Sequence, residues 1–205
     1  MGKLQSSTEL CESYRKILCN ESVTYATHGE LGFLHNLVEL ASRWQGPISV
    51  AVYAPGESFQ KTLDVIFHLR ECSHNEVKKL VTFHIFFHSY RIPNRIPKPN
   101  ELLNPKINCS IKLHDIDYWN SSHHLNEFLY PVNVARNVAK SNSATYFYFT
   151  SDIELYPSLN IIPGHTETPL KRSDNFYPVF KDTLKPLMIM TKKYYIRYEN
   201  IIKIS

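Results

Sequence analysis

The stretch that decides the fold runs Tyr130-Pro-Val-Asn-Val-Ala-Arg-Asn-Val-Ala-Lys140 and continues as Thr145-Tyr-Phe-Tyr-Phe-Thr-Ser-Asp-Ile-Glu154. Its first half carries apolar or small residues at helical spacing, and its second half is an aromatic run with strong β character. The run ends in two acids, Asp152 and Glu154, before a Tyr-Pro break. A helix that leads into a strand with carboxylates at its carboxyl end is typical of a ligand site in an α/β sheet.

Asp152 and Glu154 predict a metal site. Two acids separated by one residue can hold a hard divalent cation against a diphosphate, because Mg²⁺ and Mn²⁺ prefer oxygen ligands and leave positions open for phosphate. The alternative is a strand end followed by a turn, with both carboxylates solvated, which is the usual meaning of an isolated D-x-E pattern. The stretch around the two acids favours the metal.

The earlier part of the chain predicts strands that alternate with helices. Strands are expected at residues 23–27, 48–53 and 79–87, and helices at residues 31–41 and 57–72. This order implies right-handed parallel crossovers and therefore a doubly wound α/β sheet. The turn His28-Gly29-Glu30 follows the first strand, at the edge of the sheet where ligands bind.

The combined pattern resembles the glycosyltransferase family that includes the second domain of LARGE and beta-1,4-glucuronyltransferase 1. In that family a helix of the form YP-x-N-x-x-RN-x-A precedes a strand that ends in a metal-binding D-x-D. The segments Val23–His28 and Trp44–Tyr53 are similar to the opening of the same domain, so the resemblance covers about residues 20–163. Glu154 departs from the family pattern, whose second acid is commonly Asp.

The resemblance implies a GT-A-like doubly wound mixed sheet in a truncated form, because the family continues with a long acceptor-binding half. We expect a lead-in at residues 1–20, a nucleotide-sugar-binding part at residues 21–164 and a divergent basic tail at residues 165–205. Within the tail, residues 176–180 and 192–205 are expected to contain short strands.

The resemblance also implies donor-binding roles. The first strand and its turn would line the uridine nucleotide through Ala26, Thr27 and His28, although His28 can equally be a capping or surface histidine. Arg136 and Asn137 fall in the donor region of the family pattern.

Arg136 has two interpretations. Its guanidinium can hold the carboxylate of glucuronic acid bidentately. It can instead form a structural salt bridge with Asp152 or Glu154.

Other motifs in the sequence are weaker candidates for a functional site than Asp152 and Glu154. A second D-x-D occurs in His114-Asp-Ile-Asp117, but no long apolar strand leads into it. His84 and His88 share a strand face about 13 Å apart, too far for a joint metal site, so we predict packing or surface roles. No G-x-G-x-x-G follows the first strand, which excludes a generic dinucleotide-binding domain.

Composition indicates a globular chain of 205 residues, with 43% apolar and 20% charged residues. The net charge of +4 is concentrated in residues 171–205, which hold eight Lys or Arg against three Asp or Glu. Since no basic stripe is interleaved with aromatic residues, nucleic acid is not an expected partner.

The sequence contains no signal-peptide core and no apolar run long enough to span a bilayer. The family resembles Golgi membrane proteins that face the lumen, so membrane contact is expected only through an anchor absent from this chain. Three sequons, at Asn20, Asn108 and Asn120, suit that location. Cys11 and Cys19 could close a short disulfide loop, or the four cysteines could be free buried thiols.

The implied function is transfer of glucuronic acid from UDP-glucuronate to a xylose-containing, O-mannosyl-type glycan of a glycoprotein, with inversion. Asp152 and Glu154 would hold Mn²⁺ against the diphosphate of the UDP-sugar. The sequence offers no catalytic base for the acceptor hydroxyl. The alternative is a catalytically inactive remnant that acts as a binding module.

Overall fold

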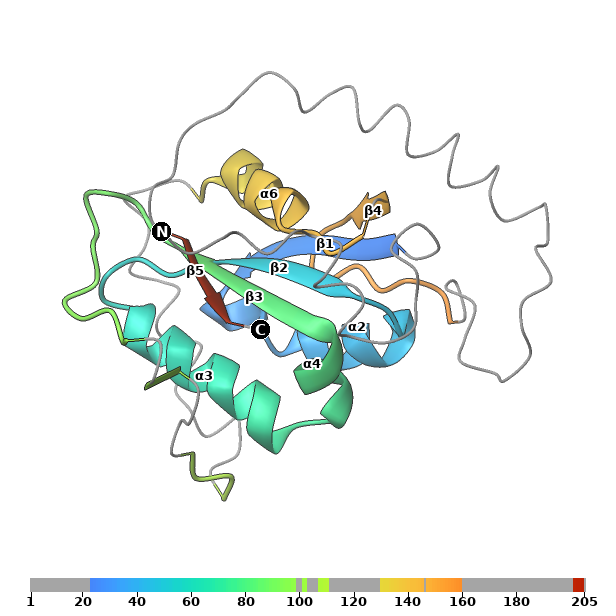
Figure 1. Cartoon of the computed structure of the whole chain (residues 1–205), viewed down its shortest axis with the longest axis horizontal. Coiled ribbons are helices and arrows are strands. Elements are labelled where there is room, and N and C mark those ends of the chain that lie inside the picture. The colour runs from blue at the N-terminus through green and yellow to red at the C-terminus, as the bar shows by residue number, and fades with distance from the viewer. Residues whose placement is uncertain are drawn as a thin grey trace, which may run out of the picture.

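The computed structural model describes residues 23–98, 101–102, 107–110, 130–145, 147–159 and 201–204 (Figure 1). These segments form one five-stranded sheet in the order β4-β1-β2-β3-β5. The bounds of the strands are β1 Val23–Glu30, β2 Ile48–Tyr53, β3 Val81–Phe86, β4 Phe147–Thr150 and β5 Ile201–Ile204.

The sheet is mixed. The strands β1 to β4 are parallel to their neighbours, whereas β5 pairs antiparallel with β3, with Ile204 opposite Phe83. The predicted doubly wound mixed α/β sheet, consistent with a GT-A-like fold, is therefore confirmed.

Helices cover both faces of the sheet (Figure 1). On one face lie the short 3-10 helix η1 and the helices α2, α3 and α4, and α6 lies on the other. Their bounds are η1 Leu31–Phe33, α2 Asn36–Trp44, α3 Phe59–Cys72, α4 Asn75–Leu80 and α6 Val132–Ser141. The stretch from residue 130 to residue 154 thus supplies α6 and β4, and β4 pairs with β1.

Strand alternation sorts the core into two layers. Tyr25, Val50 and Val52 belong to the larger cluster under α2 and α3, while Ala26 and Ala51 belong to a smaller cluster with α6. Because these two positions are alanines, α6 can lie close to the sheet. The Oγ of Ser49 donates a 2.7 Å hydrogen bond to the carbonyl oxygen of Ala139, which fixes the end of α6 on β2.

Two local predictions need correction. The strand expected at residues 79–87 begins only at Val81, because residues 75–80 form α4 and bury Val77 and Leu80. The helix expected at residues 31–41 begins as η1. After a short break α2 follows and ends at Trp44, and the next residue, Gln45, has a left-handed φ of 55°. The tail prediction of a strand within residues 192–205 is confirmed by β5.

A disulfide joins Cys72, the last residue of α3, to Cys109, with 5.3 Å between the Cα atoms. The idea that the cysteines are all free thiols is therefore wrong. Cys11 and Cys19 lie outside the described residues, as do His114–Asp117 and residues 176–180. None of the helices in the described part of the chain is long and apolar enough to cross a membrane.

Candidate functional site

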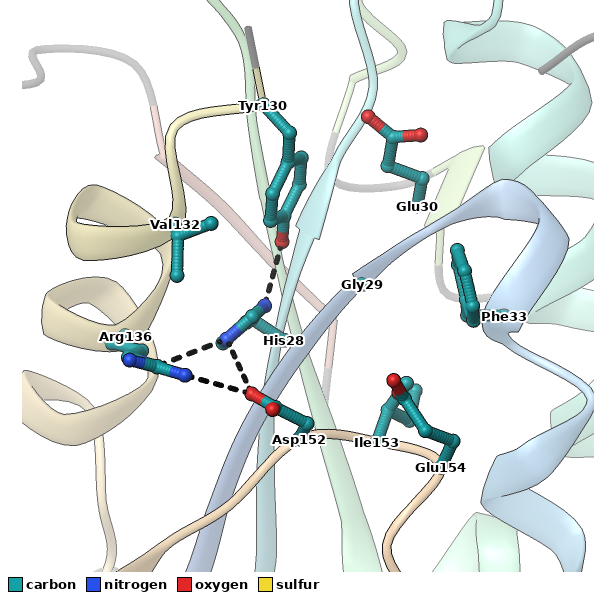
Figure 2. Close-up of a pocket in the computed structure, with 10 residues that line it drawn as sticks. All are labelled: His28, Gly29, Glu30, Phe33, Tyr130, Val132, Arg136, Asp152, Ile153 and Glu154. Carbon is teal, nitrogen blue, oxygen red and sulfur yellow. Dashed lines mark hydrogen bonds and ion pairs between the residues drawn. The ribbon is translucent and has the colours of Figure 1, made fainter. Parts of the chain in front are cut away.

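The site lies at the carboxyl end of β1, between β4 and the crossover to β2. β1 continues through α2 on one face of the sheet, whereas β4 is reached through α6 on the other, so the strand order reverses here. Such switch points leave a crevice in α/β sheets. A cavity of about 340 Å³ occupies it (Figure 2). Its lining residues are His28, Gly29, Glu30, Phe33, Tyr130, Val132, Arg136, Asp152, Ile153 and Glu154.

Strand alternation explains why His28 faces the cavity from the α6 side. Ala26 packs against α6, and the residue two positions further on the same face is His28, which is 7% exposed. On α6, Val132 and Arg136 are four residues apart and therefore share one face. The end of β1 and the first turns of α6 consequently bring an imidazole and a guanidinium together.

Two core residues, Ile153 and Tyr25, hold the acidic turn at residues 152–154 in place. Ile153 is 1% exposed and packs in the larger core cluster, so Asp152 and Glu154 on either side of it are turned outward. The buried phenol of Tyr25 donates a 2.6 Å hydrogen bond to the carbonyl oxygen of Leu155. The backbone N–H of Ser151 donates to the carbonyl oxygen of Ala26, which extends the pairing of β4 with β1 up to the acids.

Gly29 lets this turn approach β1. A Cβ atom at this position would lie 3.3 Å from the Cβ of Phe33 and 3.5 Å from side-chain atoms of Ile153. An added Cβ would therefore make ordinary contact with Ile153 and require Phe33 to shift by a few tenths of an ångström.

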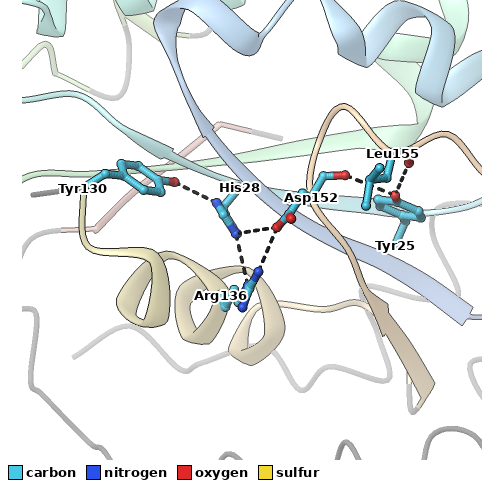
Figure 3. Close-up of polar contacts among 6 residues, drawn as sticks. All are labelled: Tyr25, His28, Tyr130, Arg136, Asp152 and Leu155. Carbon is cyan, nitrogen blue, oxygen red and sulfur yellow. Dashed lines mark hydrogen bonds and ion pairs between the residues drawn. The ribbon is translucent and has the colours of Figure 1, made fainter.

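The side chains of Tyr130, Arg136 and Asp152 form a polar network around His28 (Figure 3). Its Nδ1 lies 3.0 Å from the hydroxyl oxygen of Tyr130, and its Nε2 lies 3.4 Å from Oδ1 of Asp152. Arg136 contacts both His28 and Asp152. Its Nε lies 3.3 Å from Nε2 of His28, and a terminal nitrogen of its guanidinium lies 2.9 Å from Oδ1 of Asp152.

The network admits two arrangements of the His28 proton. If Tyr130 donates to Nδ1, the proton is on Nε2 and points to Asp152. If the proton is on Nδ1 and is donated to the Tyr130 oxygen, Nε2 accepts a hydrogen bond from Arg136. The hydrogen bond that Arg136 Nε donates to Nε2 belongs to the second arrangement.

Burial dominates the electrostatics of the cavity. Desolvation and then the positive charge of Arg136 lower the pKa of His28, although Asp152 and Glu154 act in the opposite direction. Desolvation also raises the pKa of Glu30 and that of Tyr130, the latter with a contribution from the negative charge of Glu30. The neutral forms of His28 and Tyr130 are thus favoured at neutral pH.

The acidic turn fits a hard divalent ion. Asp152 and Glu154 line one cavity with carboxylate oxygens, and Figure 2 shows Asp152 turned toward Arg136 and Glu154 on the side of Phe33. Among the described residues, no group of three or more His, Cys, Asp or Glu could hold a metal ion. An ion bound here would therefore take its other ligands from a phosphate or water, as Mg²⁺ and Mn²⁺ commonly do.

The structure brings together four of the predicted site residues, namely His28, Arg136, Asp152 and Glu154, in the lining of one cavity. It does not bring Ala26, Thr27 or Asn137 there. Ala26 and Thr27 are fully buried, Thr27 on the face of the sheet away from α6, and Asn137 is one helix position beyond the face that carries Arg136.

Six of the ten lining residues were not predicted as site residues, among them Glu30, Tyr130 and Phe33. Glu30 and Tyr130 flank residues that were singled out, and Phe33, which is 47% exposed, follows in η1. The rule that ligands bind at carboxyl ends of parallel strands placed the turn His28-Gly29-Glu30 at this edge, but it assigned no role to Glu30. Tyr130 could not have been found this way, because it is 102 residues away from His28 in the sequence.

Comparisons with known proteins agree with this architecture. Residues 22–182 match the sequence profile of the family described as "Glycosyl-transferase for dystroglycan". Beta-1,4-glucuronyltransferase 1 of Danio rerio is 31% identical over 144 residues, which are 66% of this chain and 33% of that protein. The chain thus spans about a third of the length of this relative. Since the profile covers well over half of the sequence, the chain belongs to this family of glycosyltransferases.

Proposed function

We propose that the chain is the donor-binding part of a glucuronyltransferase. The reaction is transfer of glucuronic acid from UDP-glucuronate, with inversion, to a xylose-containing glycan of the O-mannosyl type on a glycoprotein. The family match and the similarity to a glucuronyltransferase support this proposal. The observation that carries it is the cavity in which the carboxylates of Asp152 and Glu154 and the guanidinium of Arg136 meet at the carboxyl ends of β1 and β4.

Asp152 and Glu154 would hold Mn²⁺ against the diphosphate end of the donor. When bound, this ion supplies a Lewis acid that stabilises negative charge on the leaving UDP. The two residues are suited to this role because Ile153 anchors the turn between them in the core and leaves both carboxylates at the cavity. Glu154 in place of the more common Asp preserves the charge and lengthens the side chain by one methylene group.

Arg136 binds the carboxylate of the glucuronic acid. In the structure it contacts Asp152 at 2.9 Å, and both side chains are about two-fifths exposed. A salt bridge with this exposure is weak, since water competes for both partners. Arg136 could therefore release Asp152, which would hold the ion, and pair with the carboxylate of the sugar instead. Its planar guanidinium suits bidentate binding of a sugar carboxylate.

The end of β1 lines the nucleotide. Ala26 and Thr27 are buried, so their contribution comes from the backbone, whereas His28 presents a neutral imidazole to the cavity. Phe33 adds an exposed ring at the rim on which a flat base can pack. Asn137 supports the donor region from α6 without lining the cavity.

The acceptor is bound by a part of the protein other than this cavity. The chain matches 33% of the related glucuronyltransferase, so the proposal covers the donor side of the reaction. We infer a Golgi lumenal location from the family resemblance, with any membrane attachment supplied by a segment other than the described helices.

The second candidate function is a catalytically inactive binding module. The observation in its favour is the same limited coverage of the relative. Such a module would retain the cavity and metal-dependent binding of UDP without transfer.

Calorimetric titration of the purified chain with UDP, with and without Mn²⁺, tests the proposal. We expect binding that requires the ion, and transfer to a xyloside acceptor then separates the enzyme from the binding module. A folded chain that binds no UDP in either condition would contradict both.

A further inference from the structure

The segment around Cys109 combines three features that have no role in sugar-donor binding. Asn108, Cys109 and Ser110 form a sequon, and all three residues are exposed. Cys109 is bonded to Cys72 at the end of α3. We propose that Asn108 is a site of N-linked glycosylation whose occupancy is limited by closure of this disulfide. The proposal rests on the secretory location inferred above.

The disulfide is independent evidence for the compartment. Disulfides persist in the endoplasmic reticulum and beyond and are rare in the cytosol, where thiols are kept reduced. The oxidising lumen that closes the Cys72–Cys109 bond also contains the enzyme that glycosylates sequons. A sequon whose central residue is in a structural disulfide is therefore exposed to this modification as the chain folds.

The position of Asn108 leaves the cavity open. α3 follows the carboxyl end of β2 and runs back along the sheet, so its last residue, Cys72, lies near the amino ends of the strands (Figure 1). The disulfide holds Cys109 within 5.3 Å of Cys72 between Cα atoms. The site of Asp152 and Arg136 is at the opposite, carboxyl ends. A glycan on Asn108 would extend into solvent from the edge away from the donor.

The local geometry leaves the reacting atom available. The backbone N–H of Ser110 donates a 3.0 Å hydrogen bond to Oδ1 of Asn108, so this contact involves the oxygen and not Nδ2. In the reaction, Nδ2 forms a bond to C1 of a lipid pyrophosphate-linked oligosaccharide. The C1–O bond breaks, the lipid pyrophosphate leaves with its electron pair, and the proton from Nδ2 passes to the base of the oligosaccharide-transferring enzyme.

Closure of the disulfide at Cys109 limits the time during which Asn108 can be glycosylated. The transferring enzyme must bind the sequon in an accessible, extended form, whereas the disulfide ties the central residue of the sequon to α3. Glycosylation is thus favoured before the bond closes and disfavoured after it. Replacing either cysteine by alanine keeps the sequon but removes the tie.

The test uses the full chain directed into the secretory pathway of cultured cells by an added signal sequence. Asn20 and Asn120 are changed to Gln, so Asn108 is the remaining sequon. We expect a fraction of the product to shift in mobility on treatment with a peptide N-glycosidase. Asn108→Gln and Ser110→Ala should each abolish the shift. Secreted chain with an intact Cys72–Cys109 bond and no shift in any fraction would overturn the proposal.

Two further variants test the role of the disulfide. Cys72→Ala and Cys109→Ala should both raise the glycosylated fraction, and by a similar factor. Unchanged or reduced occupancy in both would refute the limit set by closure. Titration of the Asn108→Gln chain with UDP and Mn²⁺ keeps this proposal separate from the proposed function. We expect donor binding equal to that of the unaltered chain, because Asn108 is remote from the cavity.

Discussion

Arg136 and Asp152 join α6 to the end of β4 through a contact of 2.9 Å between a guanidinium nitrogen and Oδ1. The pair is 16 residues apart in sequence, and both residues also contact Nε2 of His28. The guanidinium of Arg136 therefore occupies one oxygen of Asp152, the carboxylate that we propose as a metal ligand. Binding of an ion through this same oxygen would require the contact with Arg136 to rearrange.

Asp152→Asn should abolish detectable Mn²⁺-dependent binding of UDP. The amide keeps the shape of the side chain but removes the charge that holds a hard cation. Because the salt bridge with Arg136 is solvent-exposed, we expect the free energy of unfolding to fall by no more than about 1 kcal/mol. Calorimetry measures the binding, and circular dichroism with urea unfolding measures the stability.

Asp64→Asn is the matched control for this change, since Asp64 is an exposed acid on α3 far from the cavity lining. It should leave UDP binding unchanged. If the Asp152→Asn chain is folded and binds UDP with Mn²⁺ as well as the unaltered chain, the metal assignment is wrong.

Arg136→Met should weaken binding of UDP-glucuronate much more than binding of UDP-glucose. Loss of a hydrogen bond to a charged group corresponds to roughly 10- to 100-fold in affinity. The thioether chain of Met retains packing on α6 and removes the charge. Competition titrations with the two donors on the same protein samples measure the ratio.

The comparison of donors separates the two interpretations of Arg136. If Arg136 serves only as the structural partner of Asp152, both donors should lose affinity by the same factor. An equal loss would therefore refute the proposed contact with the sugar carboxylate.

The elements that could be predicted from the sequence are those with a strong local pattern. β2 and α3 show a continuous apolar run and a helical stripe, and the structure buries them as expected. α4 was not predicted because it has six residues and continues directly into β3, so its last two residues, Lys79 and Leu80, were assigned to the strand. Periodicity cannot separate elements this short.

The candidate site was predictable where it follows strand ends. His28, Asp152 and Glu154 follow β1 and β4, and parallel pairing places these ends at one edge. Which side chains then touch depends on packing over long sequence separations, as for Tyr130 with His28. The disulfide of Cys72 with Cys109 could not be deduced either, because four cysteines allow three connectivities and spacing does not choose between them.

His28 should make stability depend on pH. Its pKa in the folded chain is lowered from the ordinary value of 6.5, chiefly by burial. The unfolded chain therefore binds the proton more tightly, and the stability that comes from a neutral His28 is present above about pH 6.5 and is lost as the pH falls toward the lowered pKa. Urea unfolding at a series of pH values should show this decline.

His28→Gln should flatten the decline, whatever its effect on stability at neutral pH. His74→Gln, at an exposed histidine before α4, is the control and should leave the decline in place. The same slope in the His28→Gln and unaltered chains would show that other groups cause the dependence.

Cys72→Ala should lower the free energy of unfolding by about 4 kcal/mol, the loop-closure value for a disulfide that spans 37 residues. The bond ties residues 107–110 to α3 and restricts the unfolded chain. Cys109→Ala should cause the same loss, and the double variant should lose no more than either single variant, because both changes remove one bond. Urea unfolding without reductant measures the three values.

In the presence of a thiol reductant strong enough to open the bond, the unaltered chain should approach the stability of the variants. Losses that add in the double variant would mean that the two side chains stabilise the fold independently of a bond between them.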